Sequence, residues 1–224
     1  MCGLCGICIG RLGKRRVRDI EALTDTFTRL LLLSEHRGLH ATGVAWVKRD
    51  GTMQLAKEPL PPVLVTHNGT ILEHTRHAVR LRLRQATRVD SELLARIAQH
   101  HTGMEGIELN AFLTELHPLD GSMSLALVAT TQPEDIILLK GNMPLEVRVH
   151  QRTRALLYAS ETRILDRAIG DQDGWEPLPL AYGEGLVINT QAWTLQRMTF
   201  TFQGLNNMAG HSYTGTNTKK ERQR

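Results

Sequence analysis

The spacing of apolar residues changes along the chain, and this change restricts the fold more than any other sequence feature. Several segments before residue 122 repeat apolar residues at three- and four-residue steps, which is typical of amphipathic helices. From Ser122 onward, short apolar or alternating stretches indicate strands, and one helical pattern interrupts them. The predicted helices are 19–36, 72–83, 91–100, 109–116 and 162–169; the predicted strands are 2–9, 41–47, 53–57, 63–65, 124–129, 136–139, 145–149, 155–159, 185–188 and 194–200. This order predicts an α+β fold in which sheets pack together with helices outside.

Composition places the chain among ordinary globular proteins and excludes several classes of function. It has 224 residues, 41% of them hydrophobic and 22% charged, which is enough for a sizeable core in one domain or two small ones. No run approaches the ~18 apolar residues of a membrane span, so we expect no membrane partner. A formal charge of +4 and 4% aromatic residues give little support to nucleic-acid binding. Three cysteines crowded at one end fit a reducing compartment, and we expect a cytoplasmic location.

Cys2 is the strongest candidate for chemistry. If the initiator methionine is removed, this residue carries both a thiol and a free α-amine. Such an amine titrates near pH ~7.7–8.0, so at neutral pH a useful fraction can accept the thiol proton. A nucleophile and its base in one residue define an N-terminal-nucleophile hydrolase. Gly3 and Gly6 would allow close approach of substrate and neighbouring strands.

Other interpretations of the cysteines remain open. Cys2, Cys5 and Cys8 form a Cys-x-x-Cys-x-x-Cys run that could begin an iron–sulfur or zinc site, but a fourth cysteine is missing. Lipidation is a weaker alternative, because a myristoylation signal needs glycine at position two. Cys5 and Cys8 also suit a strand in which they serve as small buried hydrophobic residues. We therefore expect no metal and no cofactor.

Six separated motifs follow one another in an order known from one protein family. The motifs are Met1-Cys2-Gly3-Leu4-x-Gly6, Arg37-Gly38-x-His40-Ala41-Thr42-Gly43, His67-Asn68-Gly69-Thr70-Ile71, Asp90-Ser91-Glu92, Gly121-Ser122-Met123-Ser124-Leu125-Ala126 and Ala159-Ser160-Glu161. Together they resemble the class II glutamine amidotransferase domain over roughly residues 2 to 190. The resemblance implies a four-layer αββα N-terminal-nucleophile hydrolase sandwich. It also implies a hydrolase that releases ammonia from glutamine through a glutamyl-thioester intermediate.

The resemblance assigns roles to five residues. Cys2 would attack the side-chain amide of glutamine, and Asn68 and Gly69 would form the oxyanion hole. Asp90 would pair with the α-ammonium of the substrate, and Arg37 would shape the wall beside the nucleophile. Each has a simpler alternative: a turn for Asn68-Gly69, a helix cap for Asp90 and a solvated charge for Arg37. We expect His40 and His67 to have packing roles.

The sequence departs from the family pattern in one segment. Relatives carry an arginine there that clamps the α-carboxylate of glutamine, whereas only residues 58–62 stand in this place. The string His74-Thr75-Arg76-His77 comes after Asn68-Gly69 rather than before it, and its pattern indicates helix surface. Thr70 also replaces an acid found in some relatives. Activity could therefore be altered or lost, or the chain could be truncated.

Two domain boundaries complete the expectations. Residues 2–203 are predicted to form the glutaminase-like domain, and residues 204–224 a disordered basic tail, because their composition buries little apolar surface. No synthase domain follows residue 202, so a separate ammonia-accepting synthase subunit is an expected partner besides glutamine. The alternative function is a catalytically silent amidotransferase-like domain with a regulatory or interaction role.

Overall fold

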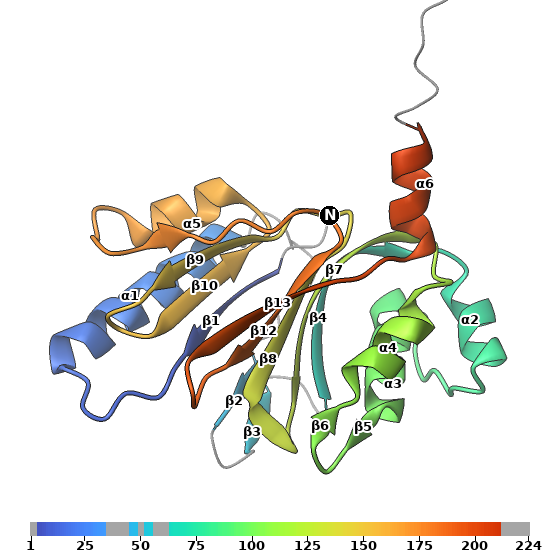
Figure 1. Cartoon of the computed structure of the whole chain (residues 1–224), viewed down its shortest axis with the longest axis horizontal. Helices are drawn as coiled ribbons and strands as arrows, with labels where there is room; N and C mark the ends of the chain where they lie inside the picture. The colour runs from blue at the N-terminus through green and yellow to red at the C-terminus, as the bar shows by residue number, and fades with distance from the viewer. Residues whose placement is uncertain (1–3, 35–44, 49–51, 56–62, 212–224) are drawn as a thin grey trace, which may run out of the picture.

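The computed structural model of the chain describes residues 4–34, 45–48, 52–55 and 63–211. These residues form two main antiparallel sheets and the helices that cover them (Figure 1). The predicted α+β class is confirmed.

The larger sheet has five strands in the order β13-β12-β8-β7-β4. Every neighbouring pair in it is antiparallel. The strands are β4 (Val63–Ile71), β7 (Gly121–Ala129), β8 (Gln132–Lys140), β12 (Glu184–Asn189) and β13 (Thr194–Thr199). β4 is therefore an edge strand within the part of the chain that the structure describes.

The smaller sheet has four strands in the order β1-β10-β9-β11, again antiparallel. They are β1 (Cys5–Ile9), β9 (Glu146–His150), β10 (Ala155–Ala159) and β11 (Glu176–Pro177). Two hairpins complete the strands: β2 (Ala45–Val47) with β3 (Met53–Leu55), and β5 (Thr102–Gly103) with β6 (Gly106–Ile107).

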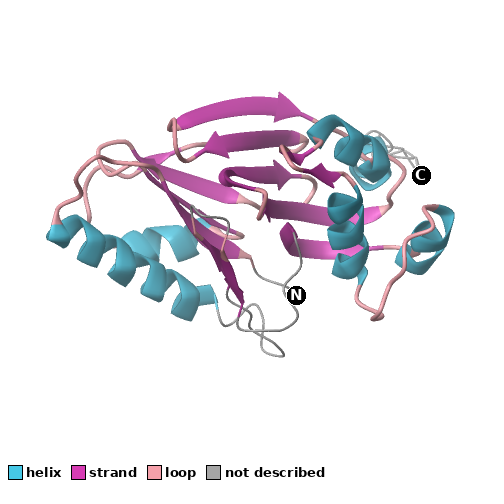
Figure 2. Cartoon of the chain, turned by 90° about the horizontal axis from the view of Figure 1, so that it is seen from below, coloured by secondary structure: helices cyan, strands magenta, loops and turns pink. Residues whose placement is uncertain are grey.

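Helices cover the outer faces of the two sheets, as seen from two directions (Figures 1 and 2). α1 (Val17–Ser34) and α5 (Thr162–Ile169) pack together on the smaller sheet. α2 (His74–Arg80), α3 (Asp90–His100) and α4 (Leu109–Leu116) lie on the side of the larger sheet. α6 (Gln203–His211) extends away from the rest of the molecule (Figure 1).

Three apolar clusters hold these elements together. One joins α3 and α4 to the larger sheet through Leu93, Ile97, Phe112, Leu125 and Leu127. A second contains residues from both sheets, among them Leu4, Cys8, Ala126, Leu138 and Leu156. A third joins α1 and α5 to the smaller sheet through Leu30, Leu157, Leu165 and Ala168. Each fully buried leucine or phenylalanine contributes about 1.5–3 kcal/mol, so these clusters provide most of the driving force for folding.

The structure differs from the sequence prediction mainly at the boundaries of elements. β4 runs through Ile71 rather than ending near residue 65, and α2 is shorter than the predicted helix 72–83. α6 covers residues 203–211, where the predicted disordered tail begins at 204. The rest of that tail lies outside the described residues. Among the described helices, none has both the length and the apolar character needed to cross a bilayer.

Candidate active site

Asn68 and Gly69 lie within strand β4, where they pair with Ser124 and Met123 of β7. The hairpin-turn alternative for this dipeptide is therefore wrong. Side chains of a strand alternate between its faces. Thr66 and Asn68 share the face toward the smaller sheet, whereas His67 and Ile71 share the face toward α3.

Gly69 has a conformation and a neighbour that exclude larger residues. Its φ is +143°, a region that side-chain-bearing residues rarely adopt. A Cβ at this position would overlap with the carbonyl oxygen of Ser122. The pairing of β4 with β7 therefore requires glycine here.

Successive N–H groups of an edge strand point alternately toward and away from the partner strand. The Thr70 N–H points toward β7, because it donates to the Ser122 hydroxyl (3.1 Å). The Ile71 N–H points the other way, to α3. At Ile71 the outer edge of β4 therefore binds a side chain of α3 rather than another strand.

The Asn68 side chain is fully buried and only partly hydrogen bonded. Its Nδ2 donates to the Pro144 carbonyl (3.3 Å), while Oδ1 has no partner among the described residues. The neighbouring Ser124 hydroxyl donates to the Met143 carbonyl (2.6 Å). Asn142 Oδ1 accepts from the Met123 N–H (2.9 Å) and fixes the same loop. A buried amide with an unsatisfied oxygen is costly and typical of functional sites.

Asp90 connects helix α3 to the edge of β4. Its Oδ2 accepts the Ile71 N–H (2.7 Å), and its Oδ1 accepts the Ser91 N–H (2.9 Å). The sequence prediction made Asp90 the N-cap of a helix starting at Ser91, and this is wrong: Asp90 is the first helical residue and Val89 is the N-cap. The carboxylate thus accepts hydrogen bonds from both the strand and the helix.

Glu92 stabilises the segment that enters α3. Its carboxylate accepts N–H bonds from Ala86 and Thr87 and also binds Arg96. Burial alone would raise the pKa of Glu92, but these hydrogen bonds outweigh it and hold the pKa at about 2. The entry to α3, and with it Asp90, is therefore held by a charged network.

His67 has a larger role than the packing role predicted for it. Its Nε2 lies 3.3 Å from the Ser122 carbonyl, which can only accept, so Nε2 carries the proton. Nδ1 then accepts from the Ser91 hydroxyl (3.0 Å). Burial lowers the pKa of His67, although the Ser122 carbonyl and the Asp90 charge act in the opposite direction. The ring connects β4, β7 and α3 directly behind Gly69. In the sequence, its position beside Asn68 was the feature that could have indicated this role.

Contacts between the two sheets bring β1 near the same face of β4. The Tyr158 hydroxyl of β10 packs against Gly6 of β1 and hydrogen bonds to Thr66 of β4. Burial raises the pKa of Tyr158, so the phenol stays neutral. Leu4, the first described residue, is buried in the cluster that contains residues from both sheets. Leu4 thus lies on the same side of β4 as Asn68.

Cys5 and Cys8 lie on opposite faces of β1, Cys5 toward α1 and α5 and Cys8 in the cluster shared by the two sheets. Burial raises the pKa of both thiols, that of Cys8 to about 12. The prediction that they are packing residues is confirmed for Cys8, which is 2% exposed, while Cys5 is half-buried. Side chains on opposite faces of one strand cannot readily hold one metal cluster.

Cys2, Arg37, His40 and residues 58–62 lie outside the described residues, so their predicted roles stay predictions. Arg76 is on the exposed surface of α2, as the sequence indicated for the string that contains it. The described residues contain no group of three or more histidine, cysteine or acidic side chains suited to a metal ion.

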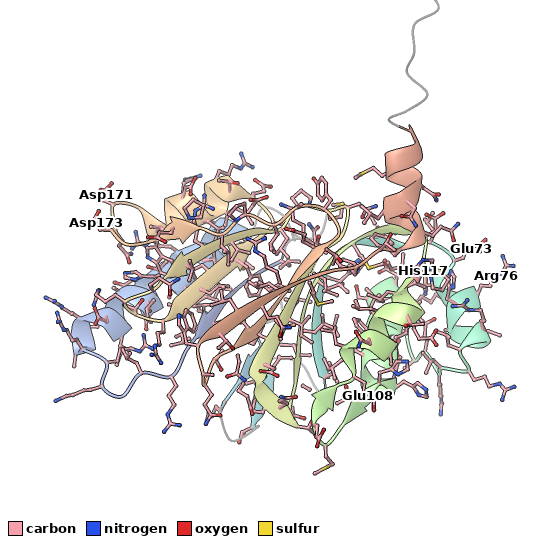
Figure 3. The ribbon with its side chains drawn as sticks, in the orientation of Figure 1. Glu73, Arg76, Glu108, His117, Asp171 and Asp173 are labelled. Atoms are coloured by element: carbon pink, nitrogen blue, oxygen red, sulfur yellow. The ribbon has the colours of Figure 1, made fainter. Side chains whose placement is uncertain are left out.

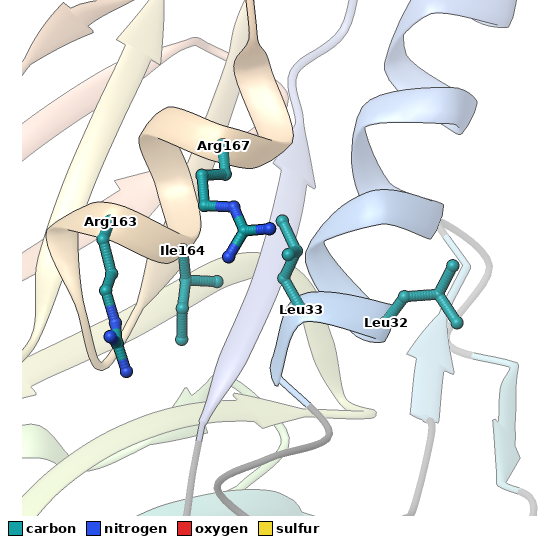
Figure 4. A pocket seen from close by; sticks show the side chains of 5 residues that line it. All are labelled: Leu32, Leu33, Arg163, Ile164 and Arg167. Carbon is teal, nitrogen blue, oxygen red and sulfur yellow. The ribbon is translucent and has the colours of Figure 1, made fainter.

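A cavity of about 300 Å³ lies elsewhere, between α1 and α5 (Figure 4). It is lined by Leu32, Leu33, Arg163, Ile164 and Arg167. Neither helix carries Asn68, Gly69 or Asp90, so this cavity is separate from the candidate site.

Comparisons with known proteins identify solved structures with a similar fold. No protein-family model matches the sequence, and no curated protein matches it either. The structure is similar to glutamine phosphoribosylpyrophosphate (PRPP) amidotransferase from B. subtilis, solved with ADP and GMP, with a TM-score of 0.62. The two are 18% identical, and the match covers 90% of this chain and 50% of that protein.

A second similar structure is described as the allosteric regulatory enzyme of purine biosynthesis. It has a TM-score of 0.51 and 18% identity, and the match covers 71% of this chain and 31% of that one. The chain thus spans half of the length of the first protein and less than a third of the second. The predicted resemblance to the class II glutamine amidotransferase domain is confirmed at the level of the fold.

Proposed function

We propose that this chain is a four-layer αββα N-terminal-nucleophile domain that hydrolyses the side-chain amide of glutamine. Cys2 is the nucleophile, Asn68 and Gly69 form the oxyanion hole, and Asp90 binds the α-ammonium group. Arg37 shapes the wall beside the nucleophile. The three apolar clusters, which join helices to each sheet and the sheets to one another, support the layered arrangement.

One observation carries the proposal: the hydrogen bond from the Ile71 N–H to Asp90 Oδ2 (2.7 Å). It joins two motifs that are about twenty residues apart in the sequence and that the resemblance assigns to one site. A carboxylate beside the edge of β4 is suited to a cationic ligand group, and the proposal assigns the Gly69 N–H to an anionic one. Glutamine bound across this edge would present both, its ammonium at one end and the developing oxyanion at the other.

The reaction follows from these groups. The Cys2 sulfur forms a bond to the amide carbon of glutamine as its proton passes to its own α-amine. The Asn68 amide and the Gly69 N–H stabilise the oxyanion, each contributing roughly 3–4 kcal/mol in comparable sites. The C–N bond then breaks, the leaving nitrogen takes the proton, and ammonia departs. Water attacks the thioester, which yields glutamate and the free thiol.

The buried Asn68 amide fits this role. Nδ2 has two hydrogens, and one of them is bound to the Pro144 carbonyl, which fixes the orientation of the amide. The proposal assigns the second hydrogen to the oxyanion. Because the amide is already desolvated and held by a loop, it would need little reorganisation during the reaction.

A catalytically silent domain is the second candidate. It is favoured by the shortness of residues 58–62, where relatives carry the arginine that clamps the substrate carboxylate. Loss of a bidentate arginine contact removes a strong and geometrically specific anchor. An active protein would pass ammonia to a separate synthase subunit in the cytoplasm, whereas a silent one would keep only a regulatory contact.

The test is labelling with a diazo-ketone analogue of norleucine, followed by peptide mass spectrometry on the full chain. We expect one adduct, on Cys2 from which Met1 has been removed, and protection by excess glutamine. Cys8→Ala is the matched control, because it removes a thiol that the proposal leaves without a role, and it should label at the wild-type rate.

Two results would contradict the enzyme proposal. One is retained Met1 in the intact mass, because a blocked Cys2 has no free α-amine. The other is an absence of labelling on correctly processed, folded protein. The second result would leave the catalytically silent domain as the better description.

A further inference from the structure

The segment that connects β4 to α3 carries a concentrated positive charge. Between residues 73 and 88 there are five arginines and one acidic residue, Glu73. The resulting net charge of +4 equals the formal net charge of the whole chain, so the remainder of the molecule is balanced. The five arginines, here called the arginine surface, are Arg76, Arg80, Arg82, Arg84 and Arg88; all are exposed.

Packing explains why these side chains point outward. Leu81 and Leu83 contact the apolar cluster under α3 and α4, so Arg82 and Arg84, which alternate with them, face solvent. Figure 3 shows Arg76 projecting away from the body of the molecule at α2, beside Glu73. The arginine surface therefore lies on the outside of the helical layer.

Local structure accounts for only two of the five arginines. Arg76 forms an ion pair with Glu73 (3.1 Å), and Arg80 stands in the last turn of α2, where a cation stabilises the helix end. Within the part of the chain that the structure describes, no carboxylate forms an ion pair with Arg82, Arg84 or Arg88. The stability of this domain does not explain their charges.

The electrostatic environment of His77 agrees with a net positive surface. Burial lowers the pKa of His77, and the charges of Arg80 and Arg76 lower it further, against the opposite effect of Glu73. An approaching anionic group would meet this field before contact, which increases the rate of association.

Aliphatic side chains lie next to the charges in the sequence. Leu72, Val79 and Val89 are 50%, 73% and 56% exposed, and they flank or interrupt the arginine segment. Arginine without lysine, combined with exposed aliphatic groups, is the composition of protein–protein interfaces, in which arginine is enriched and lysine depleted.

We propose that the arginine surface docks an acidic face of a partner protein. The carboxylates of the partner would pair with the arginines, and its apolar side chains would cover Val79 and its neighbours. This proposal does not depend on glutaminase activity, because docking uses the outer surface of residues 72–89 and not Cys2, Asn68 or Asp90.

The structure favours a protein over the two other polyanions. Residues 72–89 contain no phenylalanine, tyrosine or tryptophan, so they offer no platform on which the bases of a single strand could stack. Anchoring in a membrane interface, beyond electrostatic contact with its headgroups, would need a helix with a continuous apolar face. α2 has seven residues, and its buried residue, Ala78, already faces the core.

The test measures binding of defined probes to the full chain at low salt. The probes are a fluorescent 20-residue peptide rich in glutamate and leucine, a 20-base-pair DNA duplex, and vesicles of phosphatidylcholine with phosphatidylserine. The variants are Arg84→Gln/Arg88→Gln and, as the control, Arg163→Gln/Arg167→Gln on α5. Both pairs are exposed, have the same spacing and remove the same charge.

We expect the peptide to bind the wild-type chain and the α5 variant with similar affinity. Its affinity for Arg84→Gln/Arg88→Gln should fall about tenfold, because two interfacial charge pairs are lost. An equal loss in both variants would overturn the proposal, because binding would then reflect only total charge. Absence of peptide binding, or tighter binding of the DNA or of the vesicles, would overturn it as well.

Discussion

Strand β1 lies at one edge of the smaller sheet and strand β4 at one edge of the larger sheet in the described structure, yet the two strands have different surroundings. The side chains of β1 serve packing: Cys8 lies in the cluster shared by the sheets, and Cys5 and Ile7 contact the cluster under α1 and α5. β4 instead carries two buried polar groups: His67 accepts a hydrogen bond from Ser91 of α3, and Asn68 donates one to the Pro144 carbonyl of the loop before β9.

The comparison shows where this fold accepts an energetic cost. Buried apolar residues on an edge strand stabilise the protein, whereas a buried amide with an unsatisfied oxygen costs about 1–3 kcal/mol. The unsatisfied amide oxygen of Asn68 is energetically unfavourable, and it lies on the strand that also needs glycine at position 69 and binds the Asp90 carboxylate. β4 therefore has the properties that the proposed function requires of a binding edge, and β1 those of a structural edge.

The largest expected effect is that of Gly69→Ala. The added Cβ would overlap with the Ser122 carbonyl in a backbone conformation that alanine rarely adopts. We expect a loss of about 3–5 kcal/mol in the free energy of unfolding, from backbone strain and overpacking together, and loss of labelling by the glutamine analogue. Urea denaturation measures the first effect. Gly103→Ala is the control, because nothing lies within 4 Å of its added Cβ, and a similar loss there would show that the β4 edge is not special.

Asn68→Ala tests whether the buried amide acts on the reaction or only on stability. It should lower kcat about 10²- to 10³-fold, as loss of an oxyanion donor does, with a small net change in stability, because the lost hydrogen bond to Pro144 is offset by removal of the unsatisfied oxygen. Ser124→Ala removes a hydrogen bond to the same loop from the neighbouring residue of β7. We expect this control to lose about 1 kcal/mol with kcat unchanged. Equal kcat values in the two variants would exclude Asn68 from the chemistry.

The sequence predicts more of β1 than of β4. The apolar residues and glycines near the start of the sequence predicted strand β1 and the packing role of Cys8, because the packing of a strand follows its local residue pattern. The Asn-Gly dipeptide also occurs in hairpin turns, so local sequence could not decide that it lies inside a nine-residue strand. That outcome depends on pairing with β7, more than fifty residues away.

The polar contacts of the site were even less predictable. The Ile71–Asp90 and His67–Ser91 hydrogen bonds join residues from two elements whose packing is set by the apolar cluster under α3. Sequence spacing could suggest that the motifs belong together, but not which backbone N–H meets which carboxylate. The short strands β5, β6 and β11 were also missed, since two residues carry no periodic signal.

Asp90→Asn separates recognition of the substrate from the structure of the β4 edge. Asparagine has one acceptor oxygen, so it can keep the bond from the Ile71 N–H but loses the one from the Ser91 N–H, and it lacks the charge that would bind an ammonium group. We expect KM for glutamine to rise about 10- to 100-fold, the equivalent of 1.5–3 kcal/mol, and the free energy of unfolding to fall by about 1 kcal/mol. Asp120→Asn is matched, because Asp120 also accepts a strand N–H, that of Gly121. An unchanged KM in Asp90→Asn would remove Asp90 from the ligand site.

Low pH should destabilise the segment that leads into α3. Glu92 has a folded-state pKa of about 2, below its ordinary value of 4.5, so its contribution to stability is complete above pH 4.5 and is lost as the pH falls toward 2. Glu92→Gln should remove this part of the pH dependence and cost about 1–2 kcal/mol at neutral pH. Thermal unfolding between pH 2.5 and 7 measures both. Parallel curves for the wild type and the variant would mean that the hydrogen bonds to Ala86 and Thr87 do not favour the charged form.

The smallest effect is expected on β1, at Cys8. A thiol with a pKa near 12 and 2% exposure stays protonated and inaccessible at neutral pH, so iodoacetamide should modify it only after unfolding. Cys8→Ala should cost about 1 kcal/mol, because it deletes one small buried group from the cluster shared by the sheets. Rapid modification of Cys8 in the folded protein would contradict the contrast between the two strands. A structural edge keeps its polarisable groups away from solvent, whereas a binding edge must leave at least one of them within reach of a ligand.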